Sequence, residues 1–164
     1  MKILMVCLGN ICRSPLAEGI MKHKIEQLSL SWEVDSAGTG AWHIGERPDR
    51  RSILIARKYG IDITDQRARQ FRPHDFERFD LILAMDSSNH SDILRHAASE
   101  SDKEKVHLIM NFVNPGRNQN VPDPYWNDNG FEDVFNMLDQ ACESVISMAR
   151  SPAPSRAGIN TILP

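Results

Sequence analysis

The sequence of 164 residues has few cysteines, and its hydrophobic runs are short. The three cysteines, Cys7, Cys12 and Cys142, form an odd and sparse set, which excludes a disulfide framework and favours a reducing cytoplasm. The longest apolar run covers residues 3–8, whereas a membrane-spanning helix needs about 20 apolar residues. The same run is too short for the core of a secretory signal peptide. We therefore expect a cytoplasmic protein that does not associate with membranes.

An excess of one charge is also lacking, because 19 basic and 22 acidic residues give a net charge of -3. This balance differs from the basic excess that is typical of nucleic-acid-binding proteins, so we expect no nucleic acid as a partner. Residues 46–78 are less even, with nine of the basic residues and six of the acidic ones, or +3. Solvated helix faces and a mild attraction for an anionic substrate both fit this segment.

Metal-binding and nucleotide-binding patterns are absent as well. The six histidines are scattered without a recurring ligand spacing, and the two N-terminal cysteines have no second pair to complete a zinc site. Gly9 is not followed by the Gly-Lys-Ser/Thr of an ATPase loop, and residues 38–40 lack the third glycine of a dinucleotide-binding motif. We therefore expect neither a metal ion nor an organic cofactor.

The pattern of apolar residues predicts the fold class. The continuous apolar run over residues 3–8 is typical of a strand that is buried on both faces of a parallel sheet. We expect a second strand, weaker in pattern, over 32–36, a third over 80–85 and a fourth over 106–110. Between them, helical spacing predicts helices that follow Ser14, cover 49–60, follow Asp86 and begin at Phe131. The alternation predicts a three-layer α/β fold with a central four-stranded, mainly parallel sheet flanked by helices. We expect a single domain over residues 1–150 and a loosely ordered tail over 151–164.

Residues 7–14, Cys-Leu-Gly-Asn-Ile-Cys-Arg-Ser, follow the first strand, where the ligand sites of such folds lie. We interpret Ser14 as the N-cap of the next helix and Pro15 as its first residue. A helix N-terminus binds anions through its unpaired N–H groups and its partial positive charge. Gly9 and Asn10 tolerate the left-handed backbone that aims successive amides at one phosphate.

Two side chains of this loop carry the chemistry. The positive field of the helix start favours the thiolate of Cys7, which is the nucleophilic form of cysteine. The guanidinium of Arg13 can hold two phosphate oxygens at once. Together they predict a phosphoryl-transfer site.

The loop over residues 7–14 resembles the signature of the low-molecular-weight protein tyrosine phosphatases. Residues 123–126, Asp-Pro-Tyr-Trp, are similar to the motif that carries the general acid of that family. Residues 36–39, Trp42 and residues 84–86 match further family segments in the expected order, so the resemblance covers about residues 1–150. It implies a phosphatase domain that acts on tyrosine-phosphorylated proteins and releases inorganic phosphate.

The resemblance also implies a role for each matching residue. Cys7 attacks phosphorus, Arg13 and the loop hold the phosphate oxygens, and Asp123 acts as general acid and then as general base. The phosphate-binding residues are Leu8, Gly9, Asn10, Ile11, Cys12, Arg13 and Ser14. The loop is braced by Asn10, Ser14 and Ser36. The slot for a flat phenyl phosphate is lined by Ile11, Trp42, Tyr125 and Trp126. Cys12 protects the nucleophile through a reversible disulfide with Cys7.

Three alternatives stay open at this point. Family members that hydrolyse phosphoarginine carry Thr where Ile11 stands, and the bulkier Ile favours a flat ring. Arsenate reductases share the fold and the loop but need further cysteines after the Met-Asp strand end, where residues 86–95 contain none. A phosphopeptide-binding module without turnover has no use for Asp123. The sequence does not fix the oligomeric state, because exposed aromatic residues fit both a slot and a dimer patch.

Overall fold

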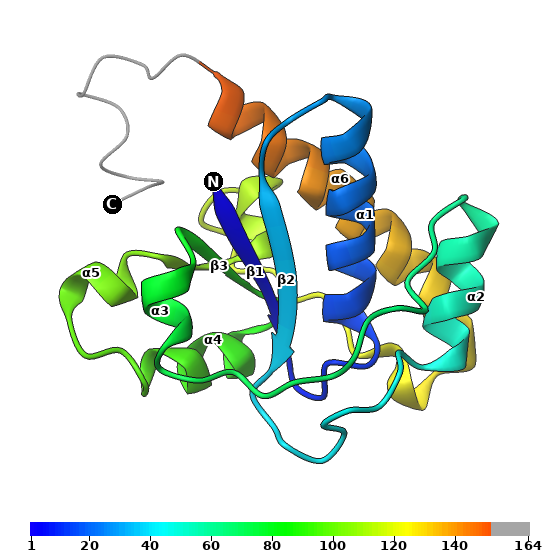
Figure 1. Ribbon diagram of the computed structural model, residues 1–164, viewed down its shortest axis with the longest axis horizontal. Coiled ribbons are helices and arrows are strands. Elements are labelled where there is room, and N and C mark those ends of the chain that lie inside the picture. Colours follow the sequence, from blue (N-terminus) through cyan, green and yellow to red (C-terminus); the bar gives the residue numbers. More distant parts are fainter. Residues whose placement is uncertain (152–164) are drawn as a thin grey trace.

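The computed structural model describes residues 1–151, and Figure 1 shows how their helices surround a central sheet. The predicted tail lies almost wholly in residues 152–164, outside the described part of the chain, so the division at residue 150 stays a prediction. None of the helices in residues 1–151 is long and apolar enough to cross a membrane. The elements are β1 (Lys2–Cys7), α1 (Arg13–Gln27), β2 (Glu33–Gly38), α2 (Arg50–Lys58), α3 (Asp75–Arg78), β3 (Leu81–Ala84), α4 (Ser87–Leu94), α5 (Glu100–Lys103), β4 (Val106–Leu108) and α6 (Phe131–Arg150), with short 3-10 helices η1 (Ile109–Phe112), η2 (Pro124–Trp126) and η3 (Asp128–Gly130).

The four strands form one sheet in the order β2-β1-β3-β4, and every pair is parallel. The predicted α/β fold with a four-stranded sheet is confirmed. The fourth strand ends at Leu108, two residues earlier than predicted, because the chain turns there into the 3-10 helix η1. Cys7 pairs with Gly38 in β2, and Val6 pairs with Ala84 in β3. The carboxyl ends of three strands therefore meet at one edge of the sheet.

The side chains of β1 alternate between two hydrophobic layers, as the period of two in a strand requires. Ile3, Met5 and Cys7 face the layer of α1 and α6, whereas Leu4 and Val6 face the layer of α3 and α4. Figure 1 shows α1, α2 and α6 on one side of the sheet and α3, α4 and α5 on the other. Burial of β1 on both faces explains the apolar run from Ile3 to Cys7, whereas Leu8 lies beyond the strand and is 41% exposed.

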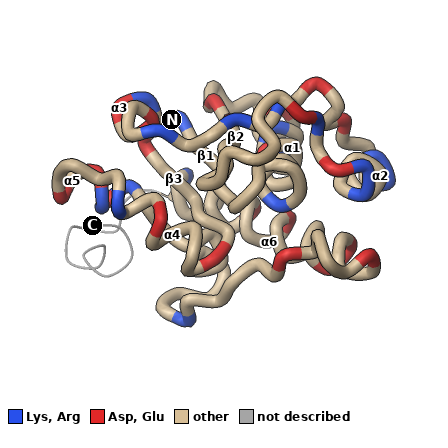
Figure 2. The backbone as a smooth tube through the Cα atoms, turned by 90° about the horizontal axis from the view of Figure 1, so that it is seen from below, with Lys and Arg blue, Asp and Glu red and all other residues tan. Residues whose placement is uncertain are grey.

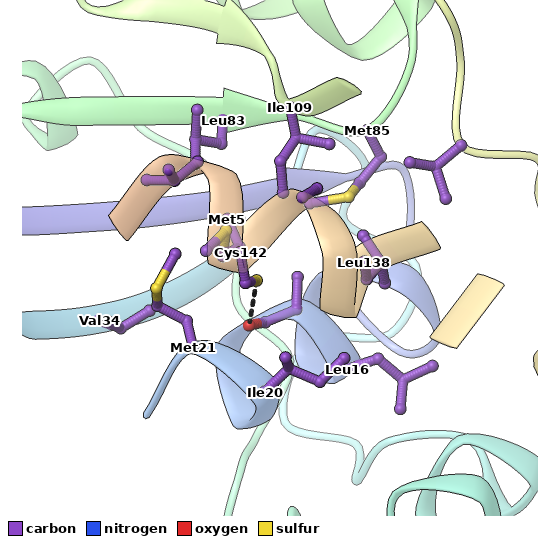
Figure 3. Packing of buried hydrophobic residues seen from close by; sticks show 14 of the residues in the cluster. Met5, Leu16, Ile20, Met21, Val34, Leu83, Met85, Ile109, Leu138 and Cys142 are labelled. Atoms are coloured by element: carbon purple, nitrogen blue, oxygen red, sulfur yellow. Dashed lines mark hydrogen bonds between the residues drawn. The ribbon is translucent and has the colours of Figure 1, made fainter. Parts of the chain in front are cut away.

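The larger layer is closed by α6, whose apolar stripe was the clearest helical pattern in the sequence. Leu138 and Cys142 of α6 meet Leu16 and Ile20 of α1 beneath Met5 of the sheet (Figure 3). All five are 0–1% exposed, and each fully buried aliphatic side chain contributes about 1.5–3 kcal/mol. The Cys142 thiol donates to the carbonyl of Ala17 at 3.7 Å. This layer fixes α1, and with it the loop that precedes α1.

The start of α1 differs from the prediction. The helix begins at Arg13 with Cys12 at the N-cap position, so the assignment of Ser14 as N-cap was wrong. Pro15 lies in the first helical turn, where backbone N–H groups have no partner within the helix. A proline therefore fits both here and at the first helical position that was predicted for it. The Ser14 side chain is thereby free to turn inward, and its Oγ lies 3.0 Å from Cys7 Sγ.

Candidate functional site

A cavity of about 280 Å³ opens at the carboxyl edge of the sheet. It lies between the loop that follows β1, the loop that follows β2 and the segment that precedes α6. Ten of the residues predicted for the site line this cavity, together with His43, which was not predicted. The lining residues are Cys7, Leu8, Gly9, Ile11, Cys12, Arg13, Trp42, His43, Asp123, Tyr125 and Trp126.

The floor of the cavity is the loop around Cys7, whose side chain is 2% exposed. The backbone N–H of Asn10 donates to Cys7 Sγ at 3.3 Å, and the Ser14 hydroxyl lies 3.0 Å from the same sulfur. Asn10 adopts a φ of 55°, the left-handed conformation predicted for it. Gly9 does not, and that part of the prediction was wrong. The glycine instead lets the His43 side chain lie close to the backbone of the loop, because a Cβ on Gly9 would lie 3.2 Å from Cδ2 of His43.

A second glycine, outside the loop, also sets its shape. A Cβ on Gly38 would lie 2.7 Å from the carbonyl oxygen of Leu8 and 3.1 Å from the amide nitrogen of Asn10. The end of β2 therefore lies directly against the backbone of residues 7–14, the phosphate loop. Thr39 continues this contact, since its N–H donates to the carbonyl of Cys7 at 2.9 Å.

The Asn10 side chain joins the loop to its surroundings. Its Nδ2 donates to Ser14 Oγ and to Ser36 Oγ, both at 2.9 Å. Its Oδ1 accepts from the backbone N–H of Arg69 at 2.9 Å. Asn10, Ser14 and Ser36 are all less than 5% exposed. The structure thus brings together the three residues predicted to brace the loop.

Arg13 is the buried cation of the site, with an exposure of 3%. Its Nη1 donates to Asp86 Oδ2 at 2.6 Å and to the carbonyl of Val121 at 3.0 Å, and its Nη2 donates to Asp123 Oδ2 at 3.3 Å. Burial alone lowers the pKa of the Arg13 guanidinium, but Cys7 and the two carboxylates outweigh it and raise the pKa above its ordinary value. Arg13 therefore stays charged and is held in one orientation.

Asp86 caps α4 and also holds Arg13, and the sequence indicated only the first of these roles. Its Oδ1 accepts from the N–H of Asn89 at 2.8 Å, which caps the helix α4 that the sequence predicts after Asp86. Its Oδ2 holds Arg13 at the same time. The signal for this second contact is a carboxylate that follows a buried strand, at the sheet edge where the loop after β1 places an arginine.

Asp123 lies at the mouth of the cavity, with its side chain 37% exposed. Its Oδ1 accepts from the N–H of Tyr125 at 3.1 Å, and its Oδ2 is the partner of Arg13. The following segment is fixed by Arg51, whose guanidinium lies 5.6 Å from the ring centroid of Tyr125 and is ion-paired with Asp128. Sequence reasoning missed this role of Arg51, because the charges of residues 46–78 suggested a solvated helix face or a mild attraction for an anionic substrate, not a contact with the segment after Asp123.

Aromatic side chains form the walls of the cavity. Trp42 is 72% exposed and Trp126 is 87% exposed, so both project from the rim, whereas Tyr125 is 36% exposed. Ile11, at 8% exposure, lines the interior.

Figure 2 shows basic residues gathered on α2. Within residues 1–151, none of the basic residues of the segment 46–78 lines the cavity.

Cys12 also faces the cavity, but its environment differs from that of Cys7. Burial raises the pKa of the Cys12 thiol to about 12, and the negative charges of Asp49, Cys7 and Asp123 add to this effect. At neutral pH Cys12 is therefore a neutral thiol. All three cysteines are free in the structure.

A loop that closes on a cysteine and an arginine at the edge of a parallel sheet, with a carboxylate at the mouth of the same cavity, is typical of one class of enzyme, the cysteine-dependent phosphatases. Residues 2–151 match the model of one family in that class, described as "Low molecular weight phosphotyrosine protein phosphatase". The chain belongs to this family.

Three similar proteins illustrate the relationship. The low molecular weight phosphotyrosine protein phosphatase of Schizosaccharomyces pombe is 43% identical over 141 residues, which are 84% of this chain and 89% of that protein. The crystal structure of a protein tyrosine phosphatase from Entamoeba histolytica superimposes with a TM-score of 0.84 at 38% identity, covering 91% of this chain and 96% of that chain. A Drosophila arginine phosphatase superimposes with a TM-score of 0.87 at 32% identity, covering 93% of this chain and 100% of that chain.

Proposed function

We propose that the protein hydrolyses phosphotyrosine on protein substrates through a phosphocysteine intermediate and releases inorganic phosphate. The observation that carries this proposal is the convergence of Cys7, Arg13 and Asp123 on one cavity with aromatic walls. A nucleophile, a buried cation and a carboxylate at the mouth are the three groups that this reaction requires.

In the first step Cys7 Sγ attacks phosphorus, and the bond from phosphorus to the tyrosine oxygen breaks. The loop amides and Arg13 hold the three remaining phosphate oxygens. Asp123 donates a proton to the leaving oxygen, because a phenolate, whose conjugate acid has a pKa of about 10, leaves more easily as the phenol. An incoming phosphate competes with Asp123 for Nη2 of Arg13, which frees the carboxyl group for the leaving oxygen.

In the second step Asp123, now a carboxylate, takes a proton from a water molecule. The water oxygen attacks phosphorus and displaces the Cys7 thiolate, which forms inorganic phosphate. The N–H of Asn10 and the hydroxyl of Ser14 are the groups that stabilise the returning negative charge on sulfur.

The direct test is hydrolysis of p-nitrophenyl phosphate and of a phosphotyrosine peptide between pH 4.5 and 8, without added metal. We expect Cys7→Ser to abolish turnover and Asp123→Ala to lower kcat by about 10²–10⁴-fold. Asp133→Ala, an exposed aspartate near the start of α6, is the matched control and should leave kcat unchanged. Turnover by the Cys7→Ser variant would contradict the phosphocysteine mechanism.

Phosphoarginine is the second candidate substrate, because one similar structure is an arginine phosphatase. Ile11 bears on the choice, since it lines the cavity and packs in a small cluster with Ala68 and Phe131. Its branched side chain suits a flat phenyl ring, whereas a threonine hydroxyl would offer an acceptor to a guanidinium N–H. We expect Ile11→Thr to shift the ratio of kcat/KM values toward phosphoarginine. An unchanged ratio would remove the argument for phosphotyrosine that rests on this residue.

We further propose that Cys12 protects Cys7 from irreversible oxidation in a reducing cytoplasm. A peroxide oxidises Cys7 to the sulfenic acid, and the Cys12 sulfur then attacks that sulfur with loss of water, which forms a disulfide. The raised pKa of Cys12 predicts that this bond forms faster as the pH increases. Mass spectrometry after mild peroxide should detect the Cys7–Cys12 disulfide. Sulfinic acid at Cys7 without that bond would refute the proposal.

A further inference from the structure

Glu18 is a buried charged residue that the proposed mechanism does not use. It lies on α1 and is 4% exposed. Its Oε1 accepts from Lys22 Nζ and its Oε2 accepts from Ser36 Oγ, both at 2.5 Å. Burial raises the pKa of this carboxyl group, and nearby Asp35 adds to the increase, while the two hydrogen bonds oppose it. A buried carboxylate costs stability, so its position next to the phosphate loop calls for a functional explanation.

The hydrogen bonds around Asn10 have a fixed direction. The backbone N–H of Arg69 can only donate, so the atom of Asn10 that faces it is the carbonyl oxygen. The amide nitrogen of Asn10 therefore donates both of its hydrogens, one to Ser14 and one to Ser36. Each of these hydroxyls accepts from Asn10 and has its own hydrogen left to donate.

The carboxylate of Glu18 determines where one of these hydrogens goes. Because a carboxylate only accepts, the Ser36 hydroxyl donates to Glu18 and offers its lone pairs to Asn10. At the other end, the Ser14 hydroxyl has Cys7 Sγ at 3.0 Å as an acceptor, with the carbonyl of Ala37 more distant at 3.4 Å. A donor that points at sulfur stabilises the thiolate.

We propose that Glu18 is a positioning residue for the nucleophile: by accepting from Ser36, it turns the lone pairs of the Ser36 hydroxyl toward Asn10, supports the amide orientation that the N–H of Arg69 gives to Asn10, and so keeps the Ser14 hydroxyl as a donor to Cys7 Sγ. The proposal rests on the function proposed above, in which Cys7 reacts as a thiolate. Lys22, whose side chain is 50% exposed, is the surface residue that holds the other carboxylate oxygen. The network thus extends from the surface of α1 to the reactive sulfur.

Glu18→Gln tests the direction of the network with almost no change in shape. Lys22 can only donate, so the glutamine turns its oxygen to Lys22 and its NH2 group to Ser36. Ser36 then loses its acceptor. The hydrogen bond from the Ser14 hydroxyl to the Cys7 thiolate is thereby weakened. We expect the ratio of the iodoacetamide alkylation rates of Cys7 at pH 5.5 and at pH 9 to fall by about tenfold. Glu26→Gln, at an exposed position of the same helix, is the matched control.

Two further variants separate positioning from a structural role. In Glu18→Gln/Lys22→Met the glutamine is free to offer its oxygen to Ser36, so the ratio of alkylation rates should recover. In a Ser36→Ala background Glu18→Gln should have no further effect on this ratio. An unchanged ratio in Glu18→Gln, or a double variant as impaired as the single one at equal Tm, would overturn the proposal.

Alkylation is measured by peptide mass, which needs no turnover. A wild-type protein that is alkylated at low pH but does not hydrolyse phosphotyrosine would refute the proposed function alone. The effect of Glu18→Gln on the alkylation rate would then still decide whether Glu18 positions the nucleophile.

Discussion

The contact between Arg13 and Asp86 can be tested by Asp86→Asn, which removes a charge but keeps the size of the side chain. The remaining amide oxygen can still cap α4 through the N–H of Asn89. What is lost is the charge-assisted hydrogen bond of 2.6 Å to a guanidinium that is 3% exposed. Such a bond contributes about 1.5–3 kcal/mol, so we take about 2 kcal/mol as the loss in the free energy of unfolding.

This loss has two measurable consequences. For a domain of this size, about 2 kcal/mol lowers Tm by about 4–8 °C. Among the contacts described above, Asp123 is then the one carboxylate left to Arg13, so the ion pair between these two residues becomes tighter. It holds the arginine away from the substrate and keeps Asp123 from acting as general acid. We expect kcat/KM for p-nitrophenyl phosphate to decrease by about 10- to 100-fold, since each tenfold corresponds to about 1.4 kcal/mol.

The assay combines thermal unfolding with steady-state kinetics and with competitive inhibition by inorganic phosphate. Ser88→Ala, on the same helix and exposed to solvent, is the control and should change neither Tm nor kcat/KM. If Asp86→Asn had the Tm and the kcat/KM of the wild type, Asp86 would not hold Arg13 in the way inferred from the structure.

The packing leads to three other predictions. Gly38→Ala should push the backbone at Leu8 outward and lower kcat/KM, with a small effect on Tm. The added Cβ of Gly130→Ala meets atoms no closer than 3.5 Å, so this control should keep the kcat/KM of the wild type, and equal kinetics for both variants would contradict the close approach at Gly38. Burial raises the pKa of Cys142 from 9.0 to about 12, so the folded protein keeps a proton that the unfolded chain releases above pH 9. Stability then decreases with pH by about 1.4 kcal/mol per unit for this thiol, and urea unfolding of Cys142→Ala at pH 8 and 10.5 should show a smaller decrease. Leu138→Ala should lower the free energy of unfolding by about 2–5 kcal/mol, and a loss below 1 kcal/mol would indicate that α6 packs less tightly than described.

Much of the fold could be predicted because strands buried on both faces leave an unambiguous pattern. The run from Ile3 to Leu8 and the stripe from Phe131 onward required no tertiary information. The start of α1 could not be predicted, because Ser14 is a good N-cap in local terms. In the folded protein its hydroxyl lies instead against the sulfur of Cys7, and the local sequence around Ser14 gives no sign of that contact.

The site shows the same division. Residues in short motifs, such as Asn10 and Asp123, could be found from their neighbours in the sequence. Residues that act across the fold could not, because Asp86, Arg51 and Glu18 have local explanations that are sufficient by themselves: a cap, a solvated helix face and a helical ion pair. Only their positions in space reveal which side chains they hold.

The contacts of Arg13 span most of the protein: its partners lie 73, 108 and 110 positions further along the chain. During synthesis Cys7 and Arg13 therefore leave the ribosome well before Asp86, Val121 and Asp123, which complete their surroundings. Contacts over such separations form late in folding. Until then the growing chain carries a cysteine without its arginine fixed in place, so phosphatase activity reports the completed fold rather than any of its parts.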